Sequence, residues 1–161
     1  MAVDMFMKIE GVKGESKDKT HPKEIDVLAW SWGMSNSGSA HVGGGAGMGK
    51  VNIQDLSFTK YVDSSSPVLA LACCKGTHYK EANLVVRKAG GNPVEYIKIK
   101  LEEVLITSIG TGGSGAEDRL TENVTLNFAK VGMDYTPQDD KGAALTAIPM
   151  AWDITANAPE S

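Results

Sequence analysis

Two glycine-rich tracts contain residue types that bind nucleotide phosphates. Residues 44–51 (GGAGMGKV) match the spacing of a phosphate-binding P-loop at Gly44, Gly49 and Lys50. Val51, however, stands where the motif needs a Ser or Thr hydroxyl for magnesium. The residues that follow alternate like a strand, so the helix whose N-terminus would hold the phosphate is missing. We therefore predict a loop here.

The second tract, GTGGSG (110–115), satisfies the dinucleotide-binding pattern through Gly110, Gly112 and Gly115. The residues after it again alternate like a strand, which removes the βαβ context that the motif requires. This tract is also predicted to be a loop. The alternative is a small nucleotide-dependent enzyme that uses Lys50 and the glycine tracts, and a nucleotide-binding titration distinguishes the two.

Histidine, cysteine and carboxylate side chains lack the spacing of a catalytic or metal site. His21, His41 and His78 occur in three separate polar or glycine-rich segments, where we expect solvated side chains. Cys73 and Cys74 are adjacent, which is a poor geometry for bridging each other. We expect free thiols that pack a helix against the core, as in a reducing compartment. We predict no catalytic residues, no metal and no cofactor, although spacing alone leaves open a triad assembled from distant residues.

Composition predicts one domain over residues 1–161, because 161 residues with 42% hydrophobic content can bury a core. The net charge of −4, with scattered Lys and Arg, argues against a nucleic-acid partner. Asp4 and Lys8 interrupt the first apolar stretch, so we expect no signal peptide. No segment approaches the roughly 18 apolar residues of a membrane-spanning helix, so we expect no membrane insertion. We expect synthesis in the cytoplasm, with any export requiring dedicated machinery.

Period-two alternation of apolar residues predicts mostly β-strands. The first strand includes residues 3–9, and a change of parity between Ile53 and Leu56 suggests a bulge at residues 54–55. Further strands are expected at these approximate positions: 82–88, 94–109, 119–131 and 146–155. Within 96–102, Ile97, Ile99 and Leu101 are expected to face inward.

One helix is predicted at about 66–75. Ser65 or Ser66 is the candidate N-cap, Pro67 lies in the first turn, and Gly76 ends the helix. The predicted fold is therefore mainly β: a two-sheet antiparallel β-barrel with one short flanking α-helix.

The run EIDVLAWSWG (24–33) predicts a strand with one bulky and one nearly bare face. The bulky face comprises Leu28, Trp30, Trp32 and Met34. The bare face comprises Ala29, Ser31 and Gly33. The bulky face would pack into the core, while the bare face would line a space that must stay unobstructed. Alternatively, Ser31 simply faces solvent between two core tryptophans.

The strand at 119–131 has a similar asymmetry. Leu120, Val124, Leu126 and Phe128 share its apolar face. Thr121, Asn123, Thr125 and Asn127 share a polar face that carries no charge. Solvated faces are usually rich in Lys and Glu, so this face suggests contact with another subunit or the lining of a passage. A Thr-rich solvated strand is the equal alternative.

Long colinear blocks of this chain resemble the haemolysin co-regulated protein (Hcp) family, the tube-forming proteins of bacterial type VI secretion systems. They are residues 12–39, 50–67, 94–109, 110–138 (GTGGSGAEDRLTENVTLNFAKVGMDYTPQ) and 151–157. The resemblance covers nearly the whole chain.

The resemblance implies a hexameric ring with a wide channel, stacked into a tube inside a contractile sheath and capped by a VgrG-type spike protein. It also implies export without a signal peptide, effector proteins bound in the ring lumen, and no catalysed reaction. Ala29, Ser31 and Gly33 would then face the lumen. A phage-type tail tube subunit that carries no effectors is the alternative, and neighbouring sheath and spike genes would separate the two.

Stacked rings need an element that reaches the next ring, and residues 35–49 form a long segment of low charge that could order on contact. The candidate stacking residues are His41, Val42, Gly43, Gly44, Gly45 and Gly47. Residues 43–49 and 139–148 follow no set family pattern, so properties that depend on these loops are not carried over by the resemblance.

Overall fold

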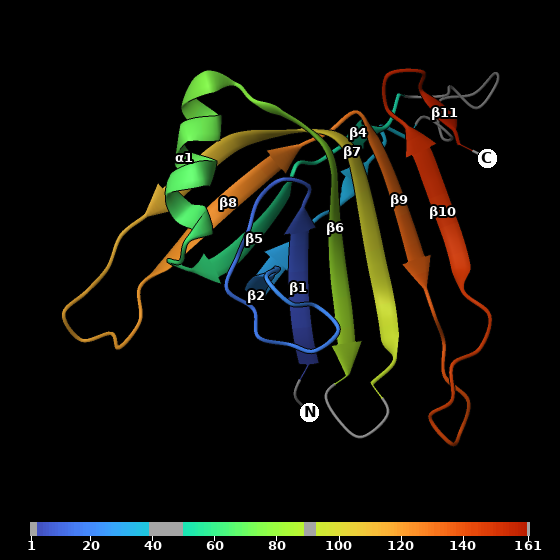
Figure 1. Cartoon of the computed structure of the whole chain (residues 1–161). Helices are drawn as coiled ribbons and strands as arrows, with labels where there is room; N and C mark the ends of the chain where they lie inside the picture. The colour runs from blue at the N-terminus through green and yellow to red at the C-terminus, as the bar shows by residue number, and fades with distance from the viewer. Residues whose placement is uncertain (1–2, 39–49, 89–92, 161) are drawn as a thin grey trace.

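The computed structural model describes residues 3–38, 50–88 and 93–160. Within these residues the chain forms eleven strands and one helix (Figure 1). The strands are β1 (Val3–Ile9), β2 (Ile25–Ser31), β3 (Met34–Ser35), β4 (Asn52–Ile53), β5 (Leu56–Tyr61), β6 (His78–Lys88), β7 (Glu95–Thr111), β8 (Thr121–Asn127), β9 (Lys130–Tyr135), β10 (Ile148–Asp153) and β11 (Ala158–Pro159). The helix is α1 (Ser65–Lys75).

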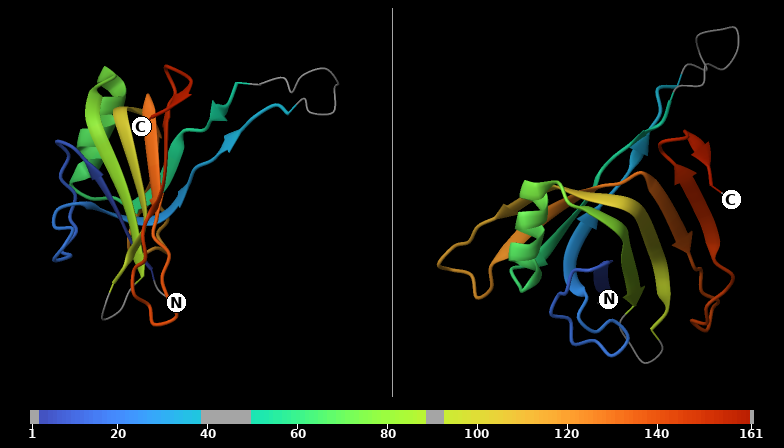
Figure 2. Two further views of the ribbon diagram at one scale, coloured as in Figure 1. Left: turned by 90° about the vertical axis from the view of Figure 1, so that its right-hand side faces the viewer. Right: turned by 45° about the horizontal axis from the view of Figure 1, so that its top comes forward.

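Nine strands form one antiparallel sheet in the order β11-β10-β9-β7-β6-β1-β2-β5-β8. An additional pairing of β7 with β8 closes β7, β6, β1, β2, β5 and β8 into a barrel. β9, β10 and β11 extend the sheet beyond this closure, and α1 flanks the barrel (Figure 1). β3 and β4 form a separate ribbon that projects away from the barrel (Figure 2). The predicted two-sheet antiparallel barrel with one short helix is confirmed.

The core arises from the alternation seen in the sequence. Met7, Leu84 and Ile99 lie opposite one another on β1, β6 and β7, and all three are buried. Each such side chain contributes about 1.5–3 kcal/mol when removed from water. Glu103 has a left-handed backbone (φ 56°), and the inward-facing pattern shifts there from Leu101 to Val104. The long strand β7 can therefore contribute to the core on both sides of this point.

The helix begins one residue earlier than predicted, and its N-cap position is Ser64 instead of Ser65 or Ser66. Ser64 makes no capping hydrogen bond with its side chain. Asp63 takes that role, because its Oδ1 accepts the backbone N–H of Ser65 at 2.9 Å. The predicted end is confirmed, since Gly76 has the left-handed conformation (φ 66°) typical of a helix C-terminus.

Three predictions about strands are wrong. Residues 119–131 are two strands, β8 and β9, and the continuation of β9 to Tyr135 was not predicted. Leu28 and Met34 are 39% and 44% exposed, because a register shift between Val27 and Ala29 turns Leu28 out and Met34 belongs to the projecting ribbon. Leu120 precedes β8 and is exposed as well.

A buried ion pair connects the barrel to the start of α1. Lys60 on β5 and Glu122 on β8 point inward, are 0% and 2% exposed, and are in direct contact. Ser66 of α1 donates a hydrogen bond to the same Glu122 carboxylate. The Lys60 ammonium also lies 3.0 Å from the Asp63 carboxylate. This cluster joins two barrel strands to the first turn of the helix.

Candidate functional site: an uncharged wall of the barrel

The register shift in β2 separates its two faces. Trp30 packs partly buried against the core, while Ala29 and Ser31 are exposed. The predicted asymmetry of this strand is therefore present at these three positions. The bare side of β2 forms one edge of a larger surface.

That surface extends across four antiparallel strands in two rows. In one row, Ser31 on β2 lies opposite Ser57 on β5, which lies opposite Thr125 on β8, which lies opposite Ser108 on β7. The second row runs in the same order through Ala29, Thr59, Asn123 and Gly110. We call this surface the polar wall: Ala29, Ser31, Ser57, Thr59, Ser108, Gly110, Asn123 and Thr125.

The polar wall carries no charged side chain, and its side chains are small. Two pairs of its side chains are hydrogen-bonded across strands: Ser57 Oγ lies 3.1 Å from Thr125 Oγ1, and the Thr59 hydroxyl donates to Asn123 Oδ1 at 2.6 Å. A shallow depression of about 190 Å³ opens between Ser31, Thr59 and Asn123. Such a surface offers hydrogen-bond donors and acceptors without charge or bulk.

Both outer strands of the polar wall have an unpaired backbone edge within the described chain. β2 pairs with β1 only through Ile25 and Asp26, so its edge beyond Asp26 is open opposite β5. β7 pairs with β6 up to Leu105, and residues 106–111 then pair with β8 on one side only. Open edges present unpaired N–H and C=O groups, which can bind a further strand.

Part of this surface is predicted by the sequence, namely the bare face of β2 and the uncharged face of β8. The structure places Ser31, Asn123 and Thr125 on one wall. The sequence pattern does not predict the remaining members Ser57, Thr59, Ser108 and Gly110. The alternation of Ser57 and Thr59 with buried Leu56 and Phe58 was the available signal.

The third predicted residue of the bare face, Gly33, lies beyond the end of β2 at the base of the projecting ribbon. Its carbonyl accepts the Gln54 N–H at 2.9 Å, and an added Cβ would lie 3.3 Å from Gln54 Oε1. The structure therefore does not place Gly33 in the rows of the polar wall. The predicted stacking residues His41, Val42, Gly43, Gly44, Gly45 and Gly47 lie outside the described residues.

The glycine tracts have the predicted strand context. Lys50 is exposed, and strands β4 and β5 follow it with no intervening helix. Gly110 ends β7, and β8 follows the second tract. Neither tract leads into the helix that nucleotide-phosphate binding needs.

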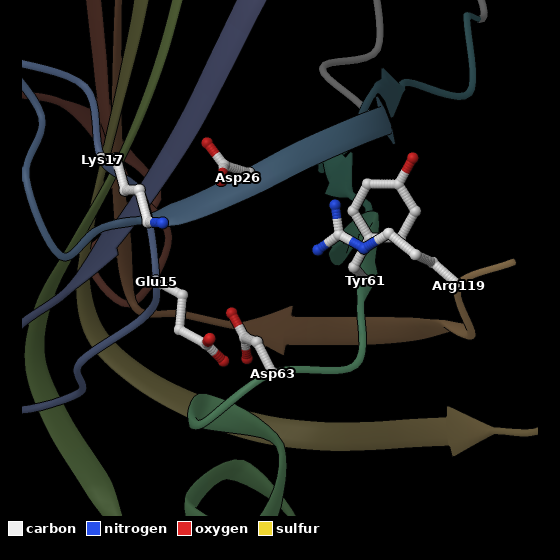
Figure 3. A pocket seen from close by; sticks show the side chains of 6 residues that line it. All are labelled: Glu15, Lys17, Asp26, Tyr61, Asp63 and Arg119. Carbon is white, nitrogen blue, oxygen red and sulfur yellow. The ribbon is translucent and has the colours of Figure 1, made fainter.

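A charged cavity of about 380 Å³ lies between the segment before β2 and strands β2 and β5 (Figure 3). It is lined by Glu15, Lys17, Asp26, Tyr61, Asp63 and Arg119. The Arg119 guanidinium lies 3.7 Å from the centre of the Tyr61 ring, in a cation–π contact. Burial raises the pKa of Asp26, and the Arg119 charge opposes this. Among the described residues, the lining therefore consists of carboxylates, cations and one tyrosine.

The expectation of solvated histidines is wrong for His21, which is buried and contacts Glu24 and Glu95. His78 is exposed at the start of β6, as expected. Cys73 and Cys74 are free thiols, as expected, but only Cys73 packs against the core and Cys74 is exposed.

Among the described residues, no group of three or more His, Cys, Asp or Glu side chains could hold a metal ion. The one helix seen in that part of the chain is neither long nor apolar enough to cross a membrane.

Comparison with known proteins places the chain among type VI secretion proteins. Residues 6–135 match the family model described as "Type VI secretion system effector, Hcp". Protein hcp1 of Pseudomonas aeruginosa is 65% identical over 159 residues, which cover 98% of each chain. The chain belongs to the Hcp family.

Solved structures agree with this assignment. The structure of a type six secretion system protein is 31% identical, has a TM-score of 0.93, and aligns over 99% of this chain and 100% of the other. Hcp1 from Salmonella typhimurium is 36% identical, with a TM-score of 0.82 and the same coverage.

Proposed function

We propose that this protein is the structural subunit of a type VI secretion inner tube. Six copies form a ring, rings stack into a tube within a contractile sheath, and a VgrG-type spike protein caps the tube. The protein is cytoplasmic before export and leaves the cell through this machine, carrying effector proteins in the ring lumen. The observation that carries the proposal is the polar wall with its two open edges, in a chain of the Hcp family.

The open edges support ring closure. The polar wall contributes four antiparallel strands in the order β2, β5, β8, β7, so β7 of one copy would run antiparallel to β2 of the next. An even number of strands per copy lets this alternation continue around a closed ring. At about 4.8 Å between strands, six copies give a circumference of about 115 Å and a diameter of about 37 Å before strand tilt. Such a channel is wide enough for a small folded protein.

A second surface supports association between copies. Tyr135, Ile148 and Met150 lie on one face of β9 and β10, and all three are exposed. A closed ring of identical subunits needs two different complementary surfaces on each copy. Such contacts can form through the exposed apolar face beyond the barrel and through the two open edges.

Ser31 provides the test of the lumen. Ser31→Arg places a long cation on the polar wall, so we expect rings of unchanged size that bind effector proteins at least tenfold more weakly. Ser114→Arg is the matched control, because Ser114 is exposed in the loop before β8 and outside the polar wall. Effector binding of Ser31→Arg at the wild-type level, measured with a purified effector, would refute the lumen assignment.

Deletion of residues 40–48 tests the stacking role of the glycine-rich segment. We expect single hexamers to persist while filament length falls, because the deletion removes the element proposed to reach the next ring. Sedimentation and negative-stain imaging at matched protein concentration measure both. Filaments of undiminished length after the deletion would exclude this segment from stacking.

A further inference from the structure

The segment between β1 and β2, residues 10–24, is folded back on itself. Lys23 donates its backbone N–H to the Ser16 carbonyl, and Gly14 donates to the Lys23 carbonyl, both at 2.8 Å. Gly14 also approaches the backbone of Glu24 so closely that an added Cβ would lie 2.4 Å from the Glu24 oxygen. The segment therefore has one tightly packed shape.

His21 holds this segment against the barrel. Its ring is buried and stacks on Phe6 of β1, with ring centres 4.6 Å apart and an interplanar angle of 17°. Nδ1 lies 2.9 Å from Glu24 Oε2, and Nε2 lies 2.7 Å from Glu95 Oε1 at the start of β7. Glu95 is 74 positions away in the sequence, so this contact joins the segment to a distant strand.

The two contacts fit only one protonation state of the ring when both carboxylates are ionised. An ionised carboxylate only accepts hydrogen bonds, so each ring nitrogen must donate a proton. Imidazolium has two N–H donors, whereas neutral imidazole has one and points a lone pair at the other carboxylate. Loss of the ring proton therefore converts one hydrogen bond into a repulsive contact.

Other charged groups lie next to the His21 backbone and next to the partners of its ring. Asp18 of the same segment accepts the His21 backbone N–H at 3.1 Å and pairs with Arg87 of β6, which also lies near Asp4 of β1. On β7, the Lys98 ammonium lies 3.4 Å from Glu95 Oε2. Burial acts to raise the pKa of Glu95, but the His21 hydrogen bond and the nearby positive charges outweigh it and lower the pKa. The Arg87–Asp18 contact is made without the imidazole ring.

We propose that residues 10–24 form a pH-dependent clasp, which His21 closes onto β7 as imidazolium and releases as neutral imidazole. The Arg87–Asp18 pair keeps the released segment tethered. The same segment supports the helix, because Glu15 Oε2 accepts the Ser64 N–H at the start of α1. Release of the clasp therefore also loosens the first turn of α1 and the charged cavity beside it.

Hydrogen exchange of the full-length, assembled protein tests the clasp. The backbone amides of Gly14, Ser16 and Lys23 donate hydrogen bonds within the segment, so their protection factors report its order. We expect these factors to fall about tenfold between about pH 5 and about pH 9, because removal of the ring proton breaks one charge-assisted hydrogen bond. Factors that stay constant over this range would overturn the proposal.

Two variants identify the responsible groups. Glu95→Gln supplies an amide that can donate to or accept from the ring, so it should hold the segment equally well at both pH values. His78→Gln removes an exposed histidine elsewhere and should show the full wild-type response. A Glu95→Gln protein that retains the tenfold change, or a His78→Gln protein that loses it, would assign the response to another group and overturn the clasp.

Discussion

Replacing Lys60 by Met tests how the barrel behind the polar wall is held together. Lys60 is fully buried and contacts Glu122, and its ammonium also donates to the Tyr61 carbonyl and to Ser66 Oγ, each at 3.0 Å. Met fills a similar volume without the charge. The change therefore leaves the buried Glu122 carboxylate beside Ser66 but without its cation.

The expected loss is large because a buried charge becomes unpaired. Removing one partner of a buried ion pair costs about 3–5 kcal/mol in the free energy of unfolding. For a domain of this size, each kcal/mol lowers the melting temperature by about 2–4 °C, so Lys60→Met should melt about 6–20 °C lower. Converting both residues, as Lys60→Met with Glu122→Leu, should recover most of the loss, since a packed apolar pair can replace a buried ion pair.

Denaturant unfolding at one protein concentration is the appropriate assay, because association of copies adds to apparent stability. Lys100→Met is the matched control, since Lys100 pairs with Glu81 and Glu102 on the exposed face of the sheet and should matter little. A Lys60→Met protein as stable as Lys100→Met would refute the account of the buried pair. So would a double variant that is less stable than the single one.

Three further predictions concern the segment before β2 and the helix. Gly14→Ala places a methyl group 2.4 Å from the Glu24 oxygen, so we expect a loss of about 1–3 kcal/mol in denaturant unfolding, and an unchanged midpoint would contradict this. The hydrogen bond from its arginine partner holds the pKa of Asp18 at about 2, below the ordinary 3.8. The stability from this pair is therefore fully present above about pH 4 and lost as the pH falls toward about 2, and Asp18→Asn should flatten that part of the acid unfolding curve. Cys74 is exposed and Cys73 half-buried, so a thiol reagent should label Cys74 first in the folded protein, and equal labelling rates would contradict the packing.

The sequence was sufficient for the fold class because alternation and helix-end residues are local signals. Gly76 ends the helix where its conformational freedom predicts, and Val3–Ile9 forms a strand as its alternation predicts. The error at Leu28, and a change of face in β7 that was not predicted, arise where the backbone departs from strict alternation. The register shift beside Ala29 exposes Leu28, and the left-handed Glu103 changes the inward face of β7. Neither Ala29 nor Glu103 is a residue type that predicts such a change in the strand.

The candidate site was predictable strand by strand but not as a surface. Ser31 and Asn123 each lie on a bare or uncharged face in the sequence, yet their common wall depends on β5 lying between β2 and β8. His21 was missed because its partner Glu95 is far away in the chain. Contacts of this kind arise from the closure of the barrel and leave no periodic signal.

Electron cryomicroscopy of the purified protein, at a resolution that shows side chains, tests the central proposal most directly. We predict closed rings of six copies in which Ser31, Thr59 and Asn123 face the channel and β2 of each copy lies beside β7 of the next. A protein that forms no rings, or rings whose channel is lined by a different face of the barrel, would contradict the proposed role of the polar wall.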